Sequence, residues 1–272
     1  MLTDDKQGLL EMVFQDLRWA SIHPARAHLV WRQDEGHFLY AQGDREVQIL
    51  TEIGLYEKEP LLADIFLTHP AILCVIKSLP PHVEGLASVR NLRALRPSLD
   101  DAAQIIGTRI LLSSEAKPAR ILRALSKCHA AIVRTKGQPY ALAVGKTPQQ
   151  ALAATLILDK ASLAYLEGCL LGGAKTLSRP LAFLYRRVYL KRYQNQDALV
   201  VSQKGADLPR DIPLEEMAIR RAMIETGKRL VEENLVQGTW GNLSVRLDED
   251  HMLVTPSGLA YDRLTPYDLV RV

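Results

Sequence analysis

A Gly-rich turn and a following Ser-Gly turn are the part of this sequence best suited to chemistry. Residues 237–242 are Gln-Gly-Thr-Trp-Gly-Asn, and residues 255–258 are Thr-Pro-Ser-Gly. Glycine N–H groups beside a hydroxyl and an amide can surround an anion without burying a charge of their own. The pattern predicts a site for a phosphate or a carboxylate, to which Arg246 could add a charge-assisted bond. Alternatively, the glycines only permit the turn, Asn242 caps it, and Arg246 points into solvent.

Histidines and cysteines, the usual zinc ligands, form no metal-binding pattern in this chain. No two histidines have the spacing H-x-H, and there is no CxxC, so the sequence predicts no metal site. The three cysteines are far apart in apolar surroundings, which predicts buried free thiols. The histidines are His23, His28, His37, His69, His82, His129 and His251, and the cysteines are Cys74, Cys128 and Cys169.

The composition is typical of a soluble globular protein. Of 272 residues, 47% are hydrophobic and 24% are charged, which allows one large domain or two modest ones. A net charge of +3 is too small to argue for nucleic acid. No signal peptide and no apolar stretch long enough for a bilayer stand out, so the sequence predicts a cytoplasmic protein without a membrane partner.

Helical and strand patterns alternate along the chain, which predicts an α/β protein. Residues 80–100 contain three prolines and are expected to be mostly irregular, and the polar stretch 194–211 is expected to be a linker. Helices are predicted at 3–20, 60–68, 116–127, 147–169, 177–193 and 213–235, and strands at 27–32, 37–41, 71–76, 129–134, 140–144 and 268–272.

The segment 214–272 closely resembles the start of the class II aldolase/adducin family, whose members include fuculose- and rhamnulose-phosphate aldolases. The family pattern Q-G-T-x-G-N-x-S-x-R stands at residues 237–246, T-P-[ST]-G stands at 255–258, and Y-x-x-L stands at Tyr261 and Leu264. Two linked motifs in the expected order make the resemblance specific. It covers the last 59 residues, about the first third of such a domain.

Residues 55–193 resemble the remainder of the same fold more faintly, and residues 1–54 resemble a worn copy of its first third with a hairpin at Trp31–Tyr40. The resemblance implies a three-layer α/β/α class II aldolase-like domain with a mostly antiparallel central sheet, plus a partial second copy. The expected organisation is a degenerate domain at 1–195, a linker at 196–212, and the N-terminal part of a second domain at 213–272.

The resemblance implies zinc chemistry that this chain does not carry in full. Family members bind zinc with three histidines, which polarises a carbonyl, and a carboxylate acts as the base. Where the family has those histidines, this chain has Lys77 and Lys136 after its strands. Their ammonium groups could replace the charge of the metal towards an anion, or both could be solvated lysines. Glu59 is the candidate catalytic base, or else an ordinary first-turn glutamate that matches the helix dipole.

By the same resemblance, the phosphate of a substrate would be bound by Thr239, Asn242, Ser257 and Gly258. Zinc would belong to a complete second domain, and none is expected in this chain as written. The abrupt end at Val272 favours a fragment of a longer protein. The tail could otherwise pack on residues 1–195 or exchange with a partner chain.

Two functions fit these observations. The first is a non-catalytic, phosphate-binding or assembly module that lacks the metal histidines. The alternative is a zinc-dependent aldolase acting on a sugar phosphate, with its site completed beyond residue 272 or by a partner chain. Whether the chain is an enzyme stays open. The expected partners are a phosphorylated small molecule and further copies of the chain. A stripe of basic and aromatic residues at 179–193 makes nucleic acid a less favoured candidate partner.

Overall fold

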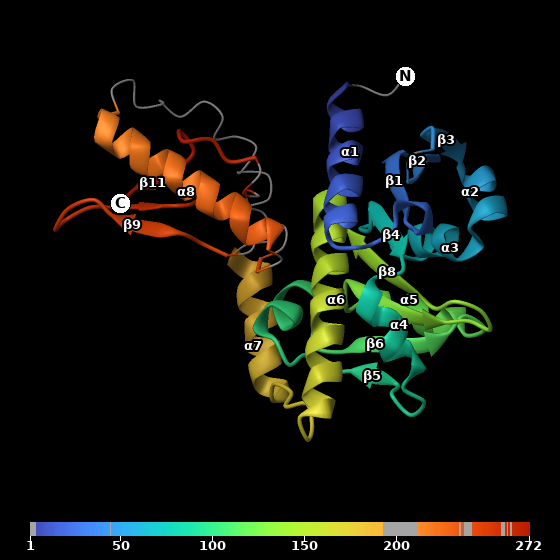
Figure 1. Cartoon of the computed structure of the whole chain (residues 1–272). Helices are drawn as coiled ribbons and strands as arrows, with labels where there is room; N and C mark the ends of the chain where they lie inside the picture. Colours follow the sequence, from blue (N-terminus) through green and yellow to red (C-terminus); the bar gives the residue numbers. More distant parts are fainter. Residues whose placement is uncertain are drawn as a thin grey trace. The chain divides into compact units, whose positions relative to one another are not determined.

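The computed structural model forms two compact units, Met1–Lys191 and Arg192–Val272, and each is described here by itself (Figure 1). The predicted linker 196–212 lies outside the described residues, apart from Ile212. The structure describes residues 4–43, 45–192, 212–233, 235–236, 241–256, 259, 261 and 263–272.

The first unit is built on an eight-stranded sheet with the order β3-β2-β1-β4-β8-β7-β6-β5. Neighbouring strands are antiparallel except for β6 and β7, which are parallel and are joined through helix α5 (Pro118–Leu125). The predicted, mostly antiparallel central sheet is therefore confirmed. The strands are β1 (His28–Asp34), β2 (His37–Gln42), β3 (Gln48–Thr51), β4 (Cys74–Ser78), β5 (Ala94–Leu95), β6 (Ile110–Ser114), β7 (Ala130–Arg134) and β8 (Tyr140–Gly145).

Helices cover both faces of this sheet, which gives the predicted three layers. Helices α1, α4 and α6 and the π-helix η2 pack on one face, and α2, α3 and α5 pack on the other (Figure 1). The remaining helix, α7, follows α6 in the chain. The bounds not yet given are α1 (Asp4–Trp19), α2 (Glu52–Lys58), α3 (Pro60–Thr68), α4 (Pro81–Ser88), η2 (Ala102–Ile106), α6 (Pro148–Leu170) and α7 (Arg179–Arg192), with a short 3₁₀ turn at Pro24–Arg26.

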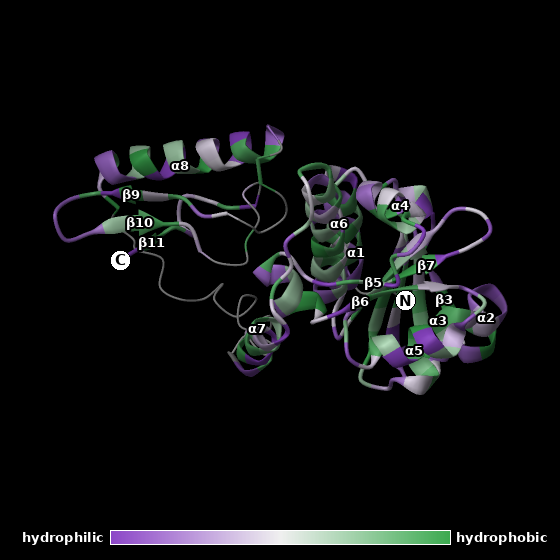
Figure 2. Ribbon diagram, turned by 90° about the horizontal axis from the view of Figure 1, so that it is seen from below, coloured by the Kyte–Doolittle hydropathy of each residue, from purple (hydrophilic) through white to green (hydrophobic). Residues whose placement is uncertain are grey.

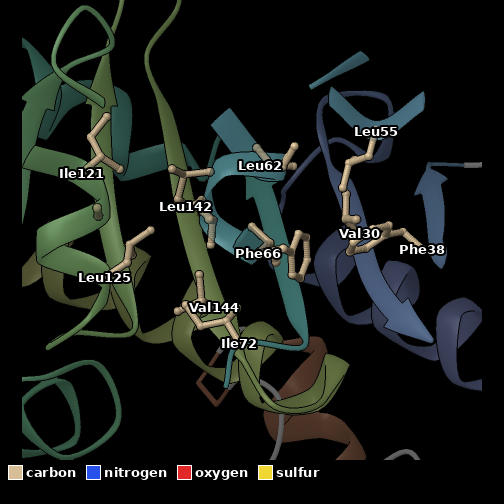
Figure 3. Packing of buried hydrophobic residues seen from close by; sticks show 14 of the residues in the cluster. Val30, Phe38, Leu55, Leu62, Phe66, Ile72, Ile121, Leu125, Leu142 and Val144 are labelled. Carbon is tan, nitrogen blue, oxygen red and sulfur yellow. The ribbon is translucent and has the colours of Figure 1, made fainter. Parts of the chain in front are cut away.

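A large apolar core fills the space between the sheet and α2, α3 and α5. Phe66 and Leu62 of α3 meet Val30 and Leu142 from the strands, and all four are nearly inaccessible to solvent (Figure 3). Each such side chain contributes about 1.5–3 kcal/mol of burial free energy. This core ends where the apolar side chains of β1 and β4 give way to His28 and Lys77, so it supports the polar site described below.

Helix α6 confirms the clearest helix prediction from the sequence. Thr147 is its N-cap and accepts a hydrogen bond from the Gln150 N–H, and Pro148 occupies the first helical position. Residues on most sides of its first half are buried, because α6 packs on the sheet and also contacts α1 and α4. A helix that is apolar on most sides is typical of a position where other elements surround it.

Several boundaries differ from the sequence predictions. The buried strand predicted at 71–76 begins later, at Cys74, and includes Lys77 and Ser78. Residues 80–100, expected to be irregular, contain α4 and β5. Pro81 stands at the first position of α4, where proline is tolerated. The Asp159 carboxylate of α6 accepts a hydrogen bond from the second N–H of α4, at His82. Because this cap comes from another helix, the residues around α4 do not indicate it.

Four more elements were not predicted, namely α2, β3, β6 and the π-helix η2. Strand β6 pairs with β7 and β5, so its position depends on partners distant in sequence. The thiol predictions are confirmed for Cys74 and Cys128, which are buried, and wrong for Cys169, which is exposed near the end of α6. No helix among the described residues is long and apolar enough to cross a bilayer.

The second unit contains helix α8 (Leu214–Glu232) and a three-stranded antiparallel sheet of β9 (Ser244–Arg246), β10 (Met252–Val254) and β11 (Val270–Arg271). Apolar and polar residues alternate along α8 (Figure 2), and Met223 and Ile224 pack with Leu253, Tyr261 and Leu269. In addition, the buried Arg220 guanidinium donates to the Pro266 and Leu269 carbonyls and pairs with Glu216. This arginine ties the last described segment to α8.

The two units share one topology at their N-terminal ends. In the first unit, α1 is followed by an antiparallel meander with the strand order β3-β2-β1, and in the second, α8 is followed by a meander with the order β11-β10-β9. In the first unit β1 also pairs with β4. Among the described residues of the second unit, β9 has no strand in the corresponding place.

The imidazole of His129, directly before β7, contacts an arginine of helix α7. Its Nε2 atom lies 3.1 Å from Nη2 of Arg186, whose Nη1 donates to the Gln104 and Ile105 carbonyls of η2. Burial and the neighbouring guanidinium lower the pKa of His129 from 6.5 to about 4. A neutral imidazole that accepts the arginine hydrogen bond is thus the native form.

We expect the unfolding free energy to decrease as the pH falls from 6.5 to about 4. The unfolded imidazole binds a proton in this window and the folded one does not, so the slope reaches at most ~1.4 kcal/mol per pH unit. His129→Gln, whose amide oxygen can still accept from Arg186, should flatten the slope in urea titrations across this range. The exposed His23→Gln is the matched control and should keep it.

Candidate functional site

The carboxylate of Glu59 lies at the centre of a polar cluster on the α2/α3 side of the sheet. Glu59 stands between α2 and α3, and its side chain is 11% exposed. It is the N-cap residue of α3, but its side chain makes no capping hydrogen bond to that helix. Instead, its oxygens contact Lys77 and His28. We call Glu59, Lys77, His28 and Tyr40 the Glu59 cluster.

Lys77 is the cation of this cluster. Its Nζ donates to Oε2 of Glu59 at 2.8 Å and to Oε1 at 3.1 Å, and its side chain is 24% exposed. It also lies 4.8 Å from the centre of the Tyr140 ring, whose hydroxyl donates to Glu115 at 3.0 Å. Lys77 is therefore a paired, half-buried lysine, and the interpretation as a solvated lysine is wrong for it. Lys136, by contrast, is exposed in the turn after β7.

His28 and Tyr40 complete the contacts of the carboxylate. Nδ1 of His28 lies 2.7 Å from Oε1 of Glu59 and 3.0 Å from the hydroxyl oxygen of Tyr40. A carboxylate can only accept hydrogen bonds, so Nδ1 of His28 carries a proton and donates a hydrogen bond to Glu59. The strand register brings the cluster together, because His28 of β1 is directly opposite Lys77 of β4 and their side chains share one face.

The ionisation states follow from these contacts. Burial alone would raise the pKa of Glu59, but the hydrogen bonds from His28 and Lys77 outweigh it and hold the pKa below its ordinary value. Burial and the Glu59 carboxylate raise the pKa of Tyr40 to about 12. Near neutral pH the cluster thus consists of a carboxylate, its paired ammonium and a phenol that keeps its proton.

This set of side chains does not fit zinc. Zinc in the family site needs several neutral imidazoles at one point, whereas the cluster offers one imidazole and an ammonium group that would first have to lose its proton. Throughout the described part of the chain, no group of three or more His, Cys, Asp or Glu side chains could hold a metal ion.

The predicted anion site of the second unit is seen only in part. Thr239, Ser257 and Gly258 lie outside the described residues. Asn242 is exposed just before β9, next to Gly241, whose φ of +93° is the left-handed conformation that favours glycine. A Cβ on Gly241 would lie 2.9 Å from Cγ1 of Val236, so a side chain here would strain the backbone and require Val236 to shift.

Thr255 joins the two motifs, a role that the sequence analysis missed. The Leu243 N–H, directly after Asn242, donates to Oγ1 of Thr255 at 3.0 Å, and the Thr255 N–H donates back to the Leu243 carbonyl at 3.0 Å. Thr255 is 8% exposed, although threonines are mostly exposed in proteins. The position of Thr255 at the start of the T-P-S-G motif was the sequence signal that could have indicated this role. The bond fixes the end of the Gly-rich turn against the start of the Ser-Gly turn.

Arg246 does not reach towards these turns. It is exposed on β9, and its Nη1 donates to the Glu249 carbonyl at 3.0 Å in the β9–β10 turn. Tyr261 lies closer to the Gly-rich turn, since a Cβ atom on Gly241 would be 3.4 Å from the Tyr261 hydroxyl. Its ring packs against Gly227 of α8, where a Cβ would lie only 2.2 Å from the ring. The Tyr of the Y-x-x-L pattern thus supports the turn from inside the unit.

Comparison with known sequences agrees with the motifs of the second unit. The sequence model described as "Class II Aldolase and Adducin N-terminal domain" matches residues 221–272. Residues 221–272 belong to the class II aldolase and adducin family.

Curated relatives match over a small part of the chain. A methylthioribulose-1-phosphate dehydratase of Bradyrhizobium is 47% identical over 49 residues, which are 18% of this chain and 23% of that protein. An L-fuculose phosphate aldolase of Escherichia coli is 40% identical over 57 residues, which are 21% of this chain and 26% of that protein. The chain thus spans about a quarter of the length of the curated relatives it matches.

Solved structures match a much larger part of the chain. An L-fuculose 1-phosphate aldolase superposes with a TM-score of 0.60 at 13% identity, over 70% of this chain and 98% of that one. An aldolase II superfamily protein from Pseudomonas syringae gives a TM-score of 0.51 at 12% identity, over 71% and 87%. The class II aldolase fold predicted from the resemblance is therefore confirmed, and at these identities the likeness concerns the fold alone.

We expect the Lys77–Glu59 pair to show strong coupling in a double-mutant cycle. Glu59→Gln leaves a half-buried ammonium without its counter-charge, and Lys77→Met removes a donor from a buried carboxylate. Each should cost about 1–3 kcal/mol of unfolding free energy near neutral pH. The double variant should cost clearly less than the sum, measured by urea unfolding. Additive effects would show that the two groups do not depend on each other.

The same pair should make stability depend on pH in the acid range. The folded pKa of Glu59 lies below the ordinary value of 4.5. Its contribution is thus complete above about 4.5 and disappears as the pH falls further, through the folded pKa. The difference in unfolding free energy between the wild type and Glu59→Gln should shrink over that interval. A constant difference down to the lowest pH would contradict this assignment.

Proposed function

We propose that this chain is an aldolase-derived module that binds a small phosphorylated molecule and does not itself cleave carbon–carbon bonds. The observation that carries the proposal is the ion pair between Lys77 and Glu59, with Nζ and Oε2 separated by 2.8 Å. It occupies the end of the buried strand β4, where the family resemblance implies metal-binding histidines. A protonated lysine has no lone pair to offer a divalent cation, and the Glu59 carboxylate beside it is already paired.

The pairing of Glu59 supports the same conclusion. A free carboxylate could act as the base that the resemblance implies. In this chain, however, the hydrogen bonds from His28 and Lys77 hold it as a carboxylate with a lowered pKa, which makes it a weak proton acceptor. Glu59 therefore serves first as the counter-charge of Lys77.

The proposed organisation is a degenerate class II aldolase-like domain at 1–195, a linker at 196–212 and the N-terminal part of a second such domain at 213–272. Its support is the shared order of a helix and a three-stranded meander in both units. A complete fuculose-phosphate aldolase chain also superposes on 70% of this chain, a share close to that of the first unit alone.

The proposed anion site of the second domain consists of Thr239, Asn242, Ser257 and Gly258. It is supported by the glycine-only turn at Gly241 and by the Thr255 bond that joins the two motifs. The matched relatives are named for methylthioribulose-1-phosphate and fuculose phosphate, both phosphorylated sugars. A phosphate is therefore the proposed anion, and a homo-oligomer in the cytoplasm is the proposed setting.

The second candidate function is a zinc-dependent aldolase acting on a sugar phosphate, with its site completed by residues beyond 272 or by a partner chain. The 40% identity to L-fuculose phosphate aldolase over 57 residues favours it. The two candidates differ in what the chain itself does with metal and substrate.

We expect no stoichiometric zinc and no retro-aldol turnover for the purified 272-residue chain. The reason is the ammonium group at the end of β4, which disfavours a divalent cation. Plasma emission spectrometry measures the metal, and a coupled assay with L-fuculose 1-phosphate measures cleavage. One tightly held zinc per chain, or cleavage that a chelator abolishes, would replace the proposed function with the second candidate.

We also expect inorganic phosphate to stabilise the second unit and Asn242→Ala to remove the effect. Binding to the folded state alone adds about 2.7 kcal/mol at a phosphate concentration one hundred times the dissociation constant. Scanning calorimetry with sulfate-free phosphate, compared with chloride at equal ionic strength, measures the shift. Asn91→Ala makes the same change at an exposed site of the first unit and should respond like the wild type. An unchanged response of Asn242→Ala would count against the loop.

A further inference from the structure

We propose that copies of this chain associate head to tail through their first units, with helix α7 of one copy packing on helix α2 of the next. The proposal rests on the homo-oligomer that belongs to the proposed function, and it names the two surfaces that form the contact. Both surfaces consist of exposed apolar side chains beside charges of a single sign, and the two signs are opposite.

Helix α7 presents a stripe of apolar side chains to solvent. Its buried side contains Ala182 and Arg186, and the Arg186 guanidinium holds the helix to the carbonyls of η2. Leu181, Leu184 and Val188 have the spacing i, i+3, i+7, which places them on one side of a helix. They are 36%, 54% and 40% exposed. A contiguous apolar stripe on an otherwise packed helix indicates an interaction surface.

The charges beside this stripe are all positive. No acidic residue occurs between residues 168 and 192. Arg187 follows Leu184 by three positions and Lys191 follows Val188 by three, so both cations lie next to the stripe. Both are exposed, and neither forms an ion pair with any residue that the structure describes. We call Leu181, Leu184, Arg187, Val188 and Lys191 the α7 surface.

Helix α2 carries a smaller surface of the opposite charge. Leu55 is the residue that this helix buries in the core, whereas Ile53 and Tyr56 are 73% and 53% exposed. Glu57 follows Ile53 by four positions and Glu52 precedes Tyr56 by four, so the carboxylates flank the two apolar residues. Both carboxylates are exposed and have no ion pair within the described ranges. We call Glu52, Ile53, Tyr56 and Glu57 the α2 surface.

The one basic residue of α2 does not weaken this negative surface. Nζ of Lys58 donates to the side chain of Gln48 at 2.6 Å and lies 4.2 Å from the centre of the Tyr40 ring. Lys58 is therefore directed at strands β3 and β2, away from the carboxylates of the α2 surface.

Charge complementarity identifies the occupant of the α7 surface as a second copy of this chain that offers its α2 surface. If α7 packed on α7, Arg187 and Lys191 would lie opposite charges of their own sign, which disfavours that pair. A nucleic acid would neutralise the cations but leave the leucines uncovered. Packing on α2 buries apolar residues of both surfaces and places carboxylates opposite the cations.

The positions of the two helices determine the type of contact. Helices α7 and α2 lie at opposite sides of the first unit in both views (Figures 1 and 2). One copy cannot bring its own two surfaces together, so the contact joins different surfaces of different copies. Such a contact is heterologous, and it leaves one α7 surface and one α2 surface open for further copies unless a ring closes.

Sedimentation velocity of the full chain over a wide range of protein concentration tests the proposal. We expect the wild type to form an assembly larger than a monomer. Arg187→Glu and Glu57→Lys should each weaken the association about tenfold or more, because each places like charges across the contact. Arg120→Glu reverses the same charge on an exposed position of α5 and should assemble like the wild type.

A mixture of the two reversed variants tests the direction of the contact. The Arg187→Glu copy keeps its α2 surface and the Glu57→Lys copy keeps its α7 surface, so these two bind as in the wild type. The changed surfaces are also complementary to each other, and the mixture should regain the assembly. If α7 paired with itself, Glu57→Lys alone would assemble like the wild type, and the proposal would be wrong.

Carbodiimide crosslinking of the wild type gives a result that does not depend on the folding of any variant. In a mixture of ¹⁴N- and ¹⁵N-labelled chains, we expect mixed-isotope peptides that join Lys191 to Glu52 or Glu57. Circular dichroism establishes that each variant used in sedimentation is folded.

Three results would overturn the proposal: a monomeric wild type, an assembly that neither charge reversal changes, or crosslinks that never join α7 to α2 of another copy. The first result would also remove the homo-oligomer from the proposed function. The other two would leave that homo-oligomer in place and reject only this contact. The phosphate response of Asn242 is independent of all three.

Discussion

The ion pair of Lys77 and Glu59 is the interaction on which the site of the first unit depends. A half-buried ammonium at the end of a central strand is tolerable only with a counter-charge and further donors. Glu59 supplies the charge, and His28 satisfies its second oxygen at 2.7 Å. The apolar core around Phe66 supports the Glu59 cluster, which lies where the apolar side chains on this face of the sheet end.

The same constraint separates fold from chemistry in this protein. The sheet order and the three layers are those of a class II aldolase, as the superposition at a TM-score of 0.60 shows. At the end of β4, however, this chain carries a lysine paired with Glu59. A scaffold can keep its layers while its donor set changes, because packing of the sheet faces and the chemistry at the strand ends involve different residues.

The second unit shows how two separated motifs act as one structure. Thr255 accepts from the Leu243 N–H and so joins the Gly-rich turn to the Ser-Gly turn. Tyr261 packs against Gly227, where no larger residue would fit, and lies beside Gly241. Both side chains come from the later segment, and the return contact is the backbone bond from the Thr255 N–H to the Leu243 carbonyl.

The sequence by itself determined the elements with strong local signals. The capped helix after Thr147, the hairpin around Trp31 and the family of the last residues could all be predicted, because capping, alternation and turn residues act over a few positions. Only the tertiary structure decided the partner of Glu59, the cap that Asp159 gives to α4, and the inclusion of Lys77 in β4. Each of these depends on a group 18 or more positions away, brought near by strand register and helix packing.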